Sequence, residues 1–200
     1  MNKANLKKNI IRFLILFVGV FIIYSIYIHI EYRHYISQSL DRNYQYLSSI
    51  SVIGDNLANR LEKFVQLPIE KEGISEVKRE LYDNWRIVNG ENKSIFFYLS
   101  VISTLHTGDE ASDWSLLQYS LFRVDSFIYG MTNKFLEHNS YAISREENEK
   151  MLAVITIYKT IRAQTDNKSA DLEIILQSIK EPMLVIDEYY PSILEQMGRF

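Results

Sequence analysis

Residues 10–30 read IIRFLILFVGVFIIYSIYIHI, and this apolar stretch decides which architecture the rest of the chain can adopt. As an α-helix, its 21 residues would span about 30 Å, the thickness of the hydrocarbon core of a bilayer. No ionisable residue lies between Phe13 and Tyr24. The stretch therefore predicts a single transmembrane helix over residues 10–30, preceded by a tail of residues 1–9.

The residues at the two edges of the stretch suit a membrane interface. Arg12 lies near the first edge, where its long stem can carry the guanidinium to the lipid headgroups. Phe13 begins the apolar centre, and Tyr24 and Tyr27 begin an aromatic belt at the far end. Arg12, Phe13, Tyr24 and Tyr27 are thus the predicted anchor residues, and the lipid bilayer is their predicted partner.

A cleaved signal peptide is the alternative to a permanent anchor. Its apolar region would be about 7–15 residues long and would end in a pair of small residues. Residues 24–30, YSIYIHI, contain no such pair, and the apolar run is longer than a signal peptide needs. A buried core helix is a poor alternative, because the stretch is apolar on all sides. We therefore expect an uncleaved anchor.

Charged residues are distributed unevenly around this anchor. Four of the 22 cations precede its apolar centre, whereas all 25 acidic residues follow it. The positive-inside rule then predicts a cytoplasmic N-terminus in the cell membrane, with residues 31–200 as an extracytoplasmic domain. These residues hold 18 cations and 25 carboxylates, a formal charge of −7. A negatively charged domain is not attracted to the phosphates of nucleic acid. We therefore expect no nucleic-acid partner.

Composition narrows the class of protein further. The chain has no cysteine, which excludes disulfides, thiolate metal sites and a cysteine nucleophile. Only 7 Gly and 3 Pro occur in 200 residues, and such scarcity suits long helices better than many short strands and turns. Ile greatly outnumbers Ala, as in proteins from AT-rich bacterial genomes. We expect one all-α domain over residues 31–200.

An apolar heptad pattern continues beyond the anchor from Tyr32 to Leu67 and ends at Pro68. It predicts that the anchor helix runs on into a helical bundle. Asn43 and Gly54 interrupt the pattern. Two interpretations stay open: a helix that packs on its own chain, which we favour, and a parallel coiled-coil homodimer whose register Asn43 sets. The possible interaction seam consists of Ile36, Leu40, Asn43, Leu47, Ile50, Leu57, Leu61 and Phe64.

Two further helices are predicted over residues 75–88 and 93–106, separated by a turn at Asn89-Gly90 and followed by Thr107-Gly108. The next segment has the clearest amphipathic pattern, with apolar residues spaced alternately by three and four positions. Such a stripe predicts a helix with one face toward a core. Its members are Trp114, Leu117, Leu121, Val124, Ile128, Met131 and Phe135.

Local capping signals predict the remaining helices. Ser144 and Glu147 have the spacing of a capping box, which opens a helix that runs to about residue 165. A short helix is predicted over residues 169–180 and is stopped by Pro182. Val185 and Ile186 could form an extended piece, but the sequence offers it no partner strand. Pro191 is placed to begin a last short helix.

The sequence contains no recognisable catalytic or cofactor motif. No two histidines have metal-ligand spacing, and there is neither a glycine-rich phosphate loop nor a G-x-S-x-G elbow. The acidic clusters at 109–113 and 146–149 lie at predicted helix starts, where the helix dipole favours carboxylates. We therefore predict no catalytic residue, no metal and no cofactor. Arg123 and Asp125 interrupt an apolar helical stretch, and a polar pocket is one interpretation of them. Because one position separates them, they should face different sides of the helix, and we expect them to be surface residues that flank the apolar stripe.

These observations favour a membrane-anchored extracytoplasmic binding or scaffold protein that acts through contacts with another membrane or envelope protein. The layout resembles the sensor half of bacterial membrane-anchored receptors in architecture, though in no motif. A sensor of a small ligand is accordingly the alternative, because helical bundles form interhelical pockets. Such a sensor would need a partner to signal, since its cytoplasmic tail is short. A carboxylate-based hydrolase is the third possibility.

Overall fold

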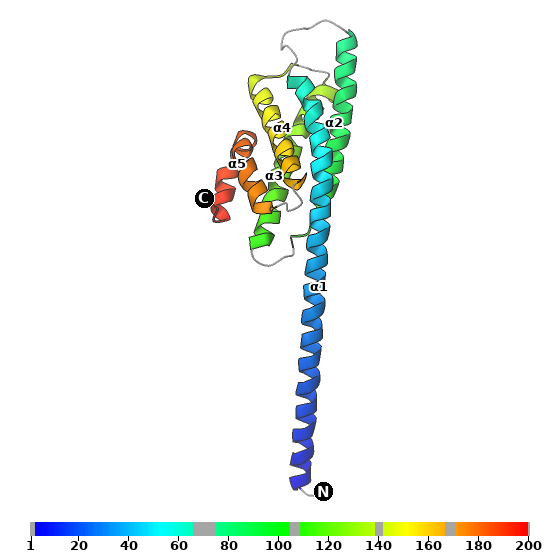
Figure 1. The fold of residues 1–200 in the computed structure, drawn as a ribbon, viewed down its shortest axis with the longest axis vertical. Helices are drawn as coiled ribbons and strands as arrows, with labels where there is room; N and C mark the ends of the chain where they lie inside the picture. Colours follow the sequence, from blue (N-terminus) through cyan, green and yellow to red (C-terminus); the bar gives the residue numbers. More distant parts are fainter. Residues whose placement is uncertain (1–2, 66–74, 105–108, 139–141, 167–170, 200) are drawn as a thin grey trace. The chain divides into compact units, whose positions relative to one another are not determined.

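The computed structural model of the chain describes residues 3–65, 75–104, 109–138, 142–166 and 171–199 (Figure 1). All regular structure in these ranges is helical, which confirms the predicted all-α class. The chain forms two compact units, Met1–Asp41 and Arg42–Phe200.

Helix α1 runs without a break from Lys3 to Val65 and contributes to both units. The predicted anchor and the heptad pattern therefore lie on one continuous helix, as the sequence predicts. In the second unit, α1 buries the side chains that recur at heptad spacing, such as Leu47, Leu57 and Leu61. The predicted stop at Pro68 lies outside the described residues.

Helix α2 runs from Ser75 to Val101, so the turn predicted at Asn89-Gly90 is wrong. The reason is that the buried face of the helix continues through the glycine. A glycine inside an exposed part of a helix costs about 1 kcal/mol, and burying one large apolar side chain outweighs that cost. The Thr107-Gly108 closure lies outside the described residues. The buried residues of α2 on this face are Trp85, Val88, Asn92, Ile95 and Leu99.

Helix α3 runs from Asp109 to Thr132 and passes directly into η1, one turn of π-helix from Asn133 to Glu137. The amphipathic stripe predicted from Trp114 to Phe135 is confirmed, because every one of its members is buried. In the π-turn, the His138 N–H donates to the Asn133 carbonyl at 3.0 Å. This wider turn keeps Phe135 in the core at the end of the stripe.

Helix α4 runs from Arg145 to Asp166, and the predicted capping box at its start is confirmed. The Ser144 N–H donates to Glu147 Oε2 at 2.7 Å, and the Glu147 N–H donates to Ser144 Oγ at 3.1 Å. Lys134 of η1 also binds the Glu147 carboxylate, with Nζ at 2.6 Å from Oε2. Through its contact with Lys134, Glu147 thus connects the start of α4 to η1.

Helix α5 runs from Leu172 to Ile186, and its first turn is capped by Asp171, which accepts from the Glu173 N–H at 3.0 Å. Pro182 lies inside this helix, so the predicted stop is wrong, and Val185 and Ile186 are helical. Buried Ile179, Met183 and Ile186 keep the segment against the core on both sides of the proline. The last helix, α6, runs from Tyr190 to Gln196, and Pro191 lies in its first turn as predicted.

In the unit Arg42–Phe200, α4 packs along α5, and α3 packs against both α2 and α5 (Figure 1). Aromatic rings join α1 to this bundle. The ring of Phe64 lies 5.0 Å from that of Trp85, which in turn lies 4.6 Å from Phe135. The Trp85 indole N–H donates to Thr132 Oγ1 at 3.0 Å, so this buried polar atom is satisfied. The core therefore unites the C-terminal part of α1 with later helices of its own chain.

Candidate functional site

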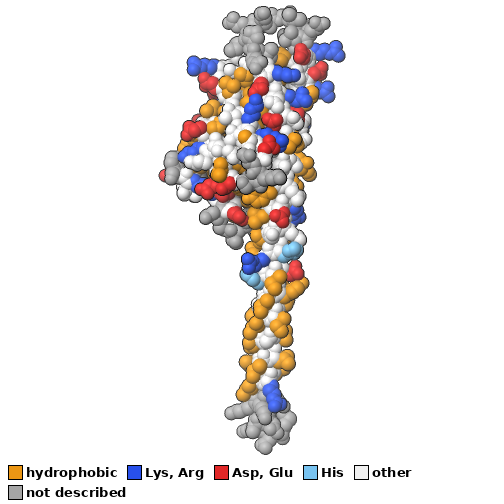
Figure 2. Space-filling model, viewed as in Figure 1, with side chains coloured by type: hydrophobic (Ala, Val, Ile, Leu, Met, Phe, Trp, Pro, Cys, Tyr) orange, Lys and Arg blue, Asp and Glu red, His pale blue; other side chains and the backbone are white. Residues whose placement is uncertain are grey.

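The apolar part of α1 is the first candidate site. Its large apolar side chains from Ile11 to Ile30 are all exposed, and the predicted anchor residues Phe13, Tyr24 and Tyr27 are 71%, 60% and 57% exposed. Figure 2 shows apolar side chains over this part of the helix. The helix is long and apolar enough to cross a membrane. Its full exposure distinguishes it from a buried core helix.

The residues of the possible interaction seam differ in burial between the two units. Ile36 and Leu40 in the first unit are only partly exposed. The six seam residues from Asn43 to Phe64 are buried within the second unit, each 2% exposed or less. A side chain that its own bundle covers has no surface left for a second copy. From Asn43 onward, the seam is therefore part of the core.

Asn43 and Gly54, the two interruptions of the heptad pattern, are both contact points with other helices. The Asn43 amide donates to the Ser103 carbonyl at 2.7 Å and accepts from the Ser103 N–H at 2.9 Å, just beyond the end of α2. Gly54 lies against the ring of Tyr158 on α4, where a Cβ would stand 2.3 Å from a ring carbon. A larger apolar side chain at either position would therefore disrupt a contact, with Ser103 in the case of Asn43 and with Tyr158 in the case of Gly54.

A polar cluster around Asp187 is the second candidate site. Its carboxylate is fully buried at the end of α5 and accepts from the Tyr119 hydroxyl at 2.6 Å. It also pairs with Arg123, whose Nη2 lies 3.1 Å from Oδ1, and accepts from the Tyr189 N–H at 3.2 Å. Burial, together with this hydrogen bond to Asp187, raises the pKa of Tyr119 to about 12. The Tyr119 hydroxyl is therefore protonated at physiological pH and donates a hydrogen bond to Asp187.

The expectation that Arg123 and Asp125 are merely surface residues is wrong, although they do face different sides of α3. Arg123 binds the buried Asp187, and Asp125 accepts from the amide of buried Asn92 at 2.6 Å. Burial raises the pKa of Asp125, and the hydrogen bond from Asn92 opposes that shift without cancelling it. Burial also raises the pKa of Tyr158, with a contribution from the charge of Asp125.

Next to the Asp187 cluster, the surface has a hollow of about 360 Å³. Arg123 forms one wall, so its guanidinium connects the hollow to the buried carboxylate. The α4 side contributes residues of its first turns, and the α5 side contributes the end of that helix. Its lining residues are Arg123, Glu146, Glu149, Lys150, Leu184, Val185, Ile186 and Glu188.

These arrangements hold side chains in place. Asp187 is closed to solvent and bound by two side chains, which makes it a structural carboxylate that joins α5 to α3. Among the described residues, no group of three histidines, cysteines or acids could hold a metal ion. Comparison of the chain with protein-family models, curated proteins and solved structures finds no match.

Sequence reasoning missed Asp187, Tyr119 and the hollow beside them. Tyr119 and Asp187 are 68 positions apart, and neither belongs to a motif. The sequence offers one weak signal, which is that Asp187 is the first of two adjacent acids directly after the apolar run Leu184–Ile186. A carboxylate in such a position needs a donor when it is buried, but nothing in the sequence identifies Tyr119 and Arg123 as those donors.

Proposed function

We propose that the chain is a membrane-anchored binding or scaffold protein that acts through contacts with another membrane or envelope protein. The observation that carries this proposal is the exposure pattern of the side chains along α1. One continuous helix has apolar side chains exposed on all sides over residues 11–30 and core side chains over residues 47–64. Attachment to the bilayer and formation of the bundle thus use the same helix. Such a chain suits a domain that works at a membrane surface.

The surface of the bundle supports contacts with a protein better than capture of an apolar small ligand. On α2, Phe96, Phe97 and Val101 are 46%, 62% and 42% exposed. Exposed aromatic side chains are enriched in protein interfaces, where they supply most of the binding energy. The hollow beside α5 is lined largely by charged side chains, whereas small-molecule pockets are mostly apolar.

For the orientation, we propose a cytoplasmic N-terminus and a bundle outside the cell membrane, because the cations cluster before the apolar stretch. The chain has no cysteine, so one introduced thiol is a unique label. Asn5→Cys and Ser192→Cys would be treated with a membrane-impermeant maleimide in intact cells. Only Ser192→Cys should react, and both should react after lysis. Labelling of Asn5→Cys in intact cells would contradict this orientation.

Photo-crosslinking of the full-length chain in living cells tests the binding function. A photoreactive residue would replace Phe97 or, in a second variant, Val185, and captured proteins would be identified by mass spectrometry. The control position is Asn56, an exposed polar residue on α1. Capture of one membrane or envelope protein at a test position, but not at Asn56, would support the proposal. Capture of nothing, or only of the chain itself, would contradict it and favour the small-ligand sensor.

A further inference from the structure

We propose that the hollow beside α5 receives a basic side chain, lysine or arginine, from the partner protein. This inference rests on the proposed function and specifies the chemistry of the partner. The volume of about 360 Å³ is at the low end for ligand pockets, so the hollow suits one side chain better than a large cofactor. The charges, the apolar rim and the fixed wall of the hollow each support this occupant.

The two cations that line the hollow are already paired. Arg123 binds the buried Asp187 at 3.1 Å, and Lys150 binds Glu146 at 2.8 Å. Turning Arg123 toward an incoming anion would leave a buried carboxylate without its cation, which is strongly destabilising. An anionic occupant would therefore have to share Arg123 with a buried carboxylate, and the three glutamates that line the hollow would repel it.

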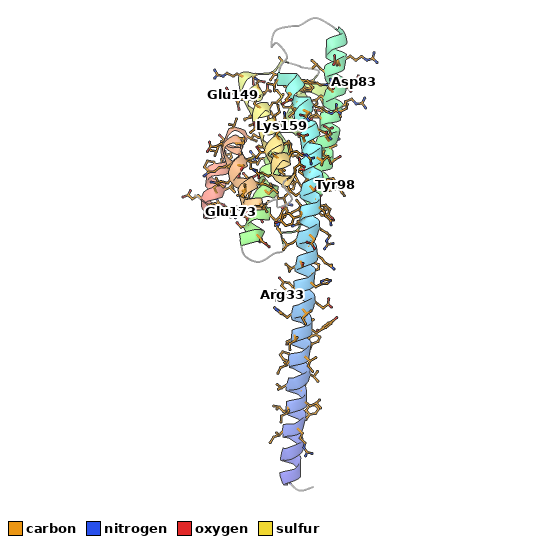
Figure 3. The ribbon with its side chains drawn as sticks, in the orientation of Figure 1. Arg33, Asp83, Tyr98, Glu149, Lys159 and Glu173 are labelled. Atoms are coloured by element: carbon orange, nitrogen blue, oxygen red, sulfur yellow. The ribbon has the colours of Figure 1, made fainter. Side chains whose placement is uncertain are left out.

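The carboxylates of the hollow outnumber its cations. Glu188 has no cationic partner among the described residues, and Glu149 pairs only with Arg145, a side chain that is 92% exposed. An exposed pair of this kind contributes little, so Glu149 can exchange Arg145 for another cation at small cost. Glu149 and Lys159 lie on the same helix, but Lys159 is turned toward α1, where it pairs with Glu62 (Figure 3). The hollow thus keeps surplus negative charge for a cation from outside.

Apolar side chains on the α5 side favour a protein over a free amine. Leu184 and Val185 line the hollow and are 37% and 45% exposed, and Tyr189 nearby is 62% exposed. A free cation would interact only through charges that salt screens over about 10 Å. A basic residue flanked by apolar residues could also cover this rim, and burial of apolar area would then add to its affinity.

Arg123, which forms one wall of the hollow, is fixed by its ion pair with the buried Asp187. Asp187, which fixes Arg123, is itself held by the Tyr119 hydroxyl and the Tyr189 N–H. A site whose walls are already ordered loses less side-chain entropy when its partner binds. The buried polar cluster therefore has a part in the proposed interface, although it does not contact the partner.

The test uses the full-length chain in lipid nanodiscs, with methyl groups of Leu, Val and Ile labelled for NMR. Three probe peptides would be added, acetyl-Leu-X-Val-amide with X as lysine, norleucine or glutamate, together with n-butylamine alone. The lysine peptide should shift the Leu184 and Val185 methyl signals at millimolar concentration. The norleucine and glutamate peptides should bind about two- to fivefold more weakly, the range expected for one partly exposed charge pair. Equal or tighter binding of the glutamate peptide would overturn the proposal, as would no shift with lysine.

Glu188→Gln should weaken binding of the lysine peptide by about two- to fivefold, while Glu173→Gln, an exposed carboxylate outside the hollow, should not. An unchanged affinity of Glu188→Gln would overturn the assignment. If n-butylamine binds as tightly as the peptide, the occupant is a free amine and the protein partner is wrong. If crosslinking captures a partner but the lysine peptide does not bind, the proposed function stands and the hollow is excluded as its site.

Discussion

At the scale of single residues, Gly54 and Gly90 show how the same residue type acts differently in two helices. The absence of a side chain at Gly54 lets the fully buried ring of Tyr158 approach α1. Gly90 is exposed on α2, and nothing lies within 4 Å of where its Cβ would be. Gly54 is therefore required by packing, whereas Gly90 only lowers the helix propensity of its segment.

Alanine at the two glycines should consequently have opposite effects. Gly54→Ala should destabilise the bundle by about 1–3 kcal/mol, because the new methyl overlaps the ring of Tyr158, which is fully buried. Gly90→Ala should stabilise it by up to about 1 kcal/mol through better helix propensity. Denaturant unfolding of the full chain in detergent, followed by circular dichroism, measures both. A stabilising Gly54→Ala would show that Tyr158 does not pack against α1.

Asp125 should make stability depend on pH in a direction that can be worked out. Burial raises its pKa in the folded chain, so its contribution to stability is complete below its unfolded-state pKa of about 3.9. That contribution is lost as the pH rises through the folded-state pKa. The ionised carboxylate beside Asn92 is thus less favourable at neutral pH than a neutral group would be.

Asp125→Asn should therefore raise the unfolding midpoint modestly at pH 7, and the gain should shrink toward pH 4. Thermal unfolding of both proteins between pH 4 and pH 8 would show this convergence. Asp83→Asn, at an exposed position of α2, is the control and should change stability by no more than about 0.5 kcal/mol. A gain for Asp125→Asn that grows as the pH falls would contradict the assigned sign.

At the scale of elements, packing overrides local helix breakers. α2 continues through Gly90 and α5 continues through Pro182, because buried residues lie on both sides of each. Side chains of other helices also form hydrogen bonds with main-chain groups at the end of a helix. Asn43 of α1 binds both main-chain polar groups of Ser103, and the Gln118 amide of α3 donates to the Leu99 carbonyl at 2.7 Å. The end of α2 is thus held by side chains from two other helices.

Asn43→Leu should destabilise the bundle by about 1–3 kcal/mol, because Ser103 loses a donor and an acceptor in a partly buried place. Light scattering with size-exclusion chromatography should show an unchanged oligomeric state. Asn56→Leu, at an exposed position of the same helix, is the matched control and should alter stability by less than about 0.5 kcal/mol. A new oligomeric state without a loss of stability would instead favour the coiled-coil homodimer.

At the scale of the whole molecule, the two units place apolar side chains in opposite environments. In the unit Arg42–Phe200, large apolar residues are mostly covered by one another, whereas from Ile11 to Ile30 they are all exposed. Figure 2 shows acidic and basic side chains interspersed on the surface of the bundle. The 16 exposed large apolar side chains of residues 11–30 suit an apolar environment, and their helix is long enough to cross a bilayer core of about 30 Å.

Charges in the centre of this stretch should abolish membrane attachment. Leu16→Asp combined with Ile22→Asp would cost about 5–7 kcal/mol of insertion free energy on the translocon scale. The protein should then move from the carbonate-resistant membrane fraction to the soluble fraction. Ile174→Asp, at an exposed apolar position on α5, should leave the protein in the membrane fraction. Retention of the double variant in the membrane would show that another segment or a partner holds the chain there.

The sequence by itself determined the helical class, the apolar stretch of residues 10–30, the buried stripe of α3 and the cap of α4. These features depend on residues within about four positions of one another, where helix geometry links sequence to structure directly. Only the tertiary structure decided that Asn43 binds Ser103, 60 positions away, and that Tyr119 and Arg123 meet at Asp187. It also decided that α2 passes through Gly90 and α5 through Pro182. The physical reason is that such contacts depend on which helices pack together, and a local pattern does not contain that information.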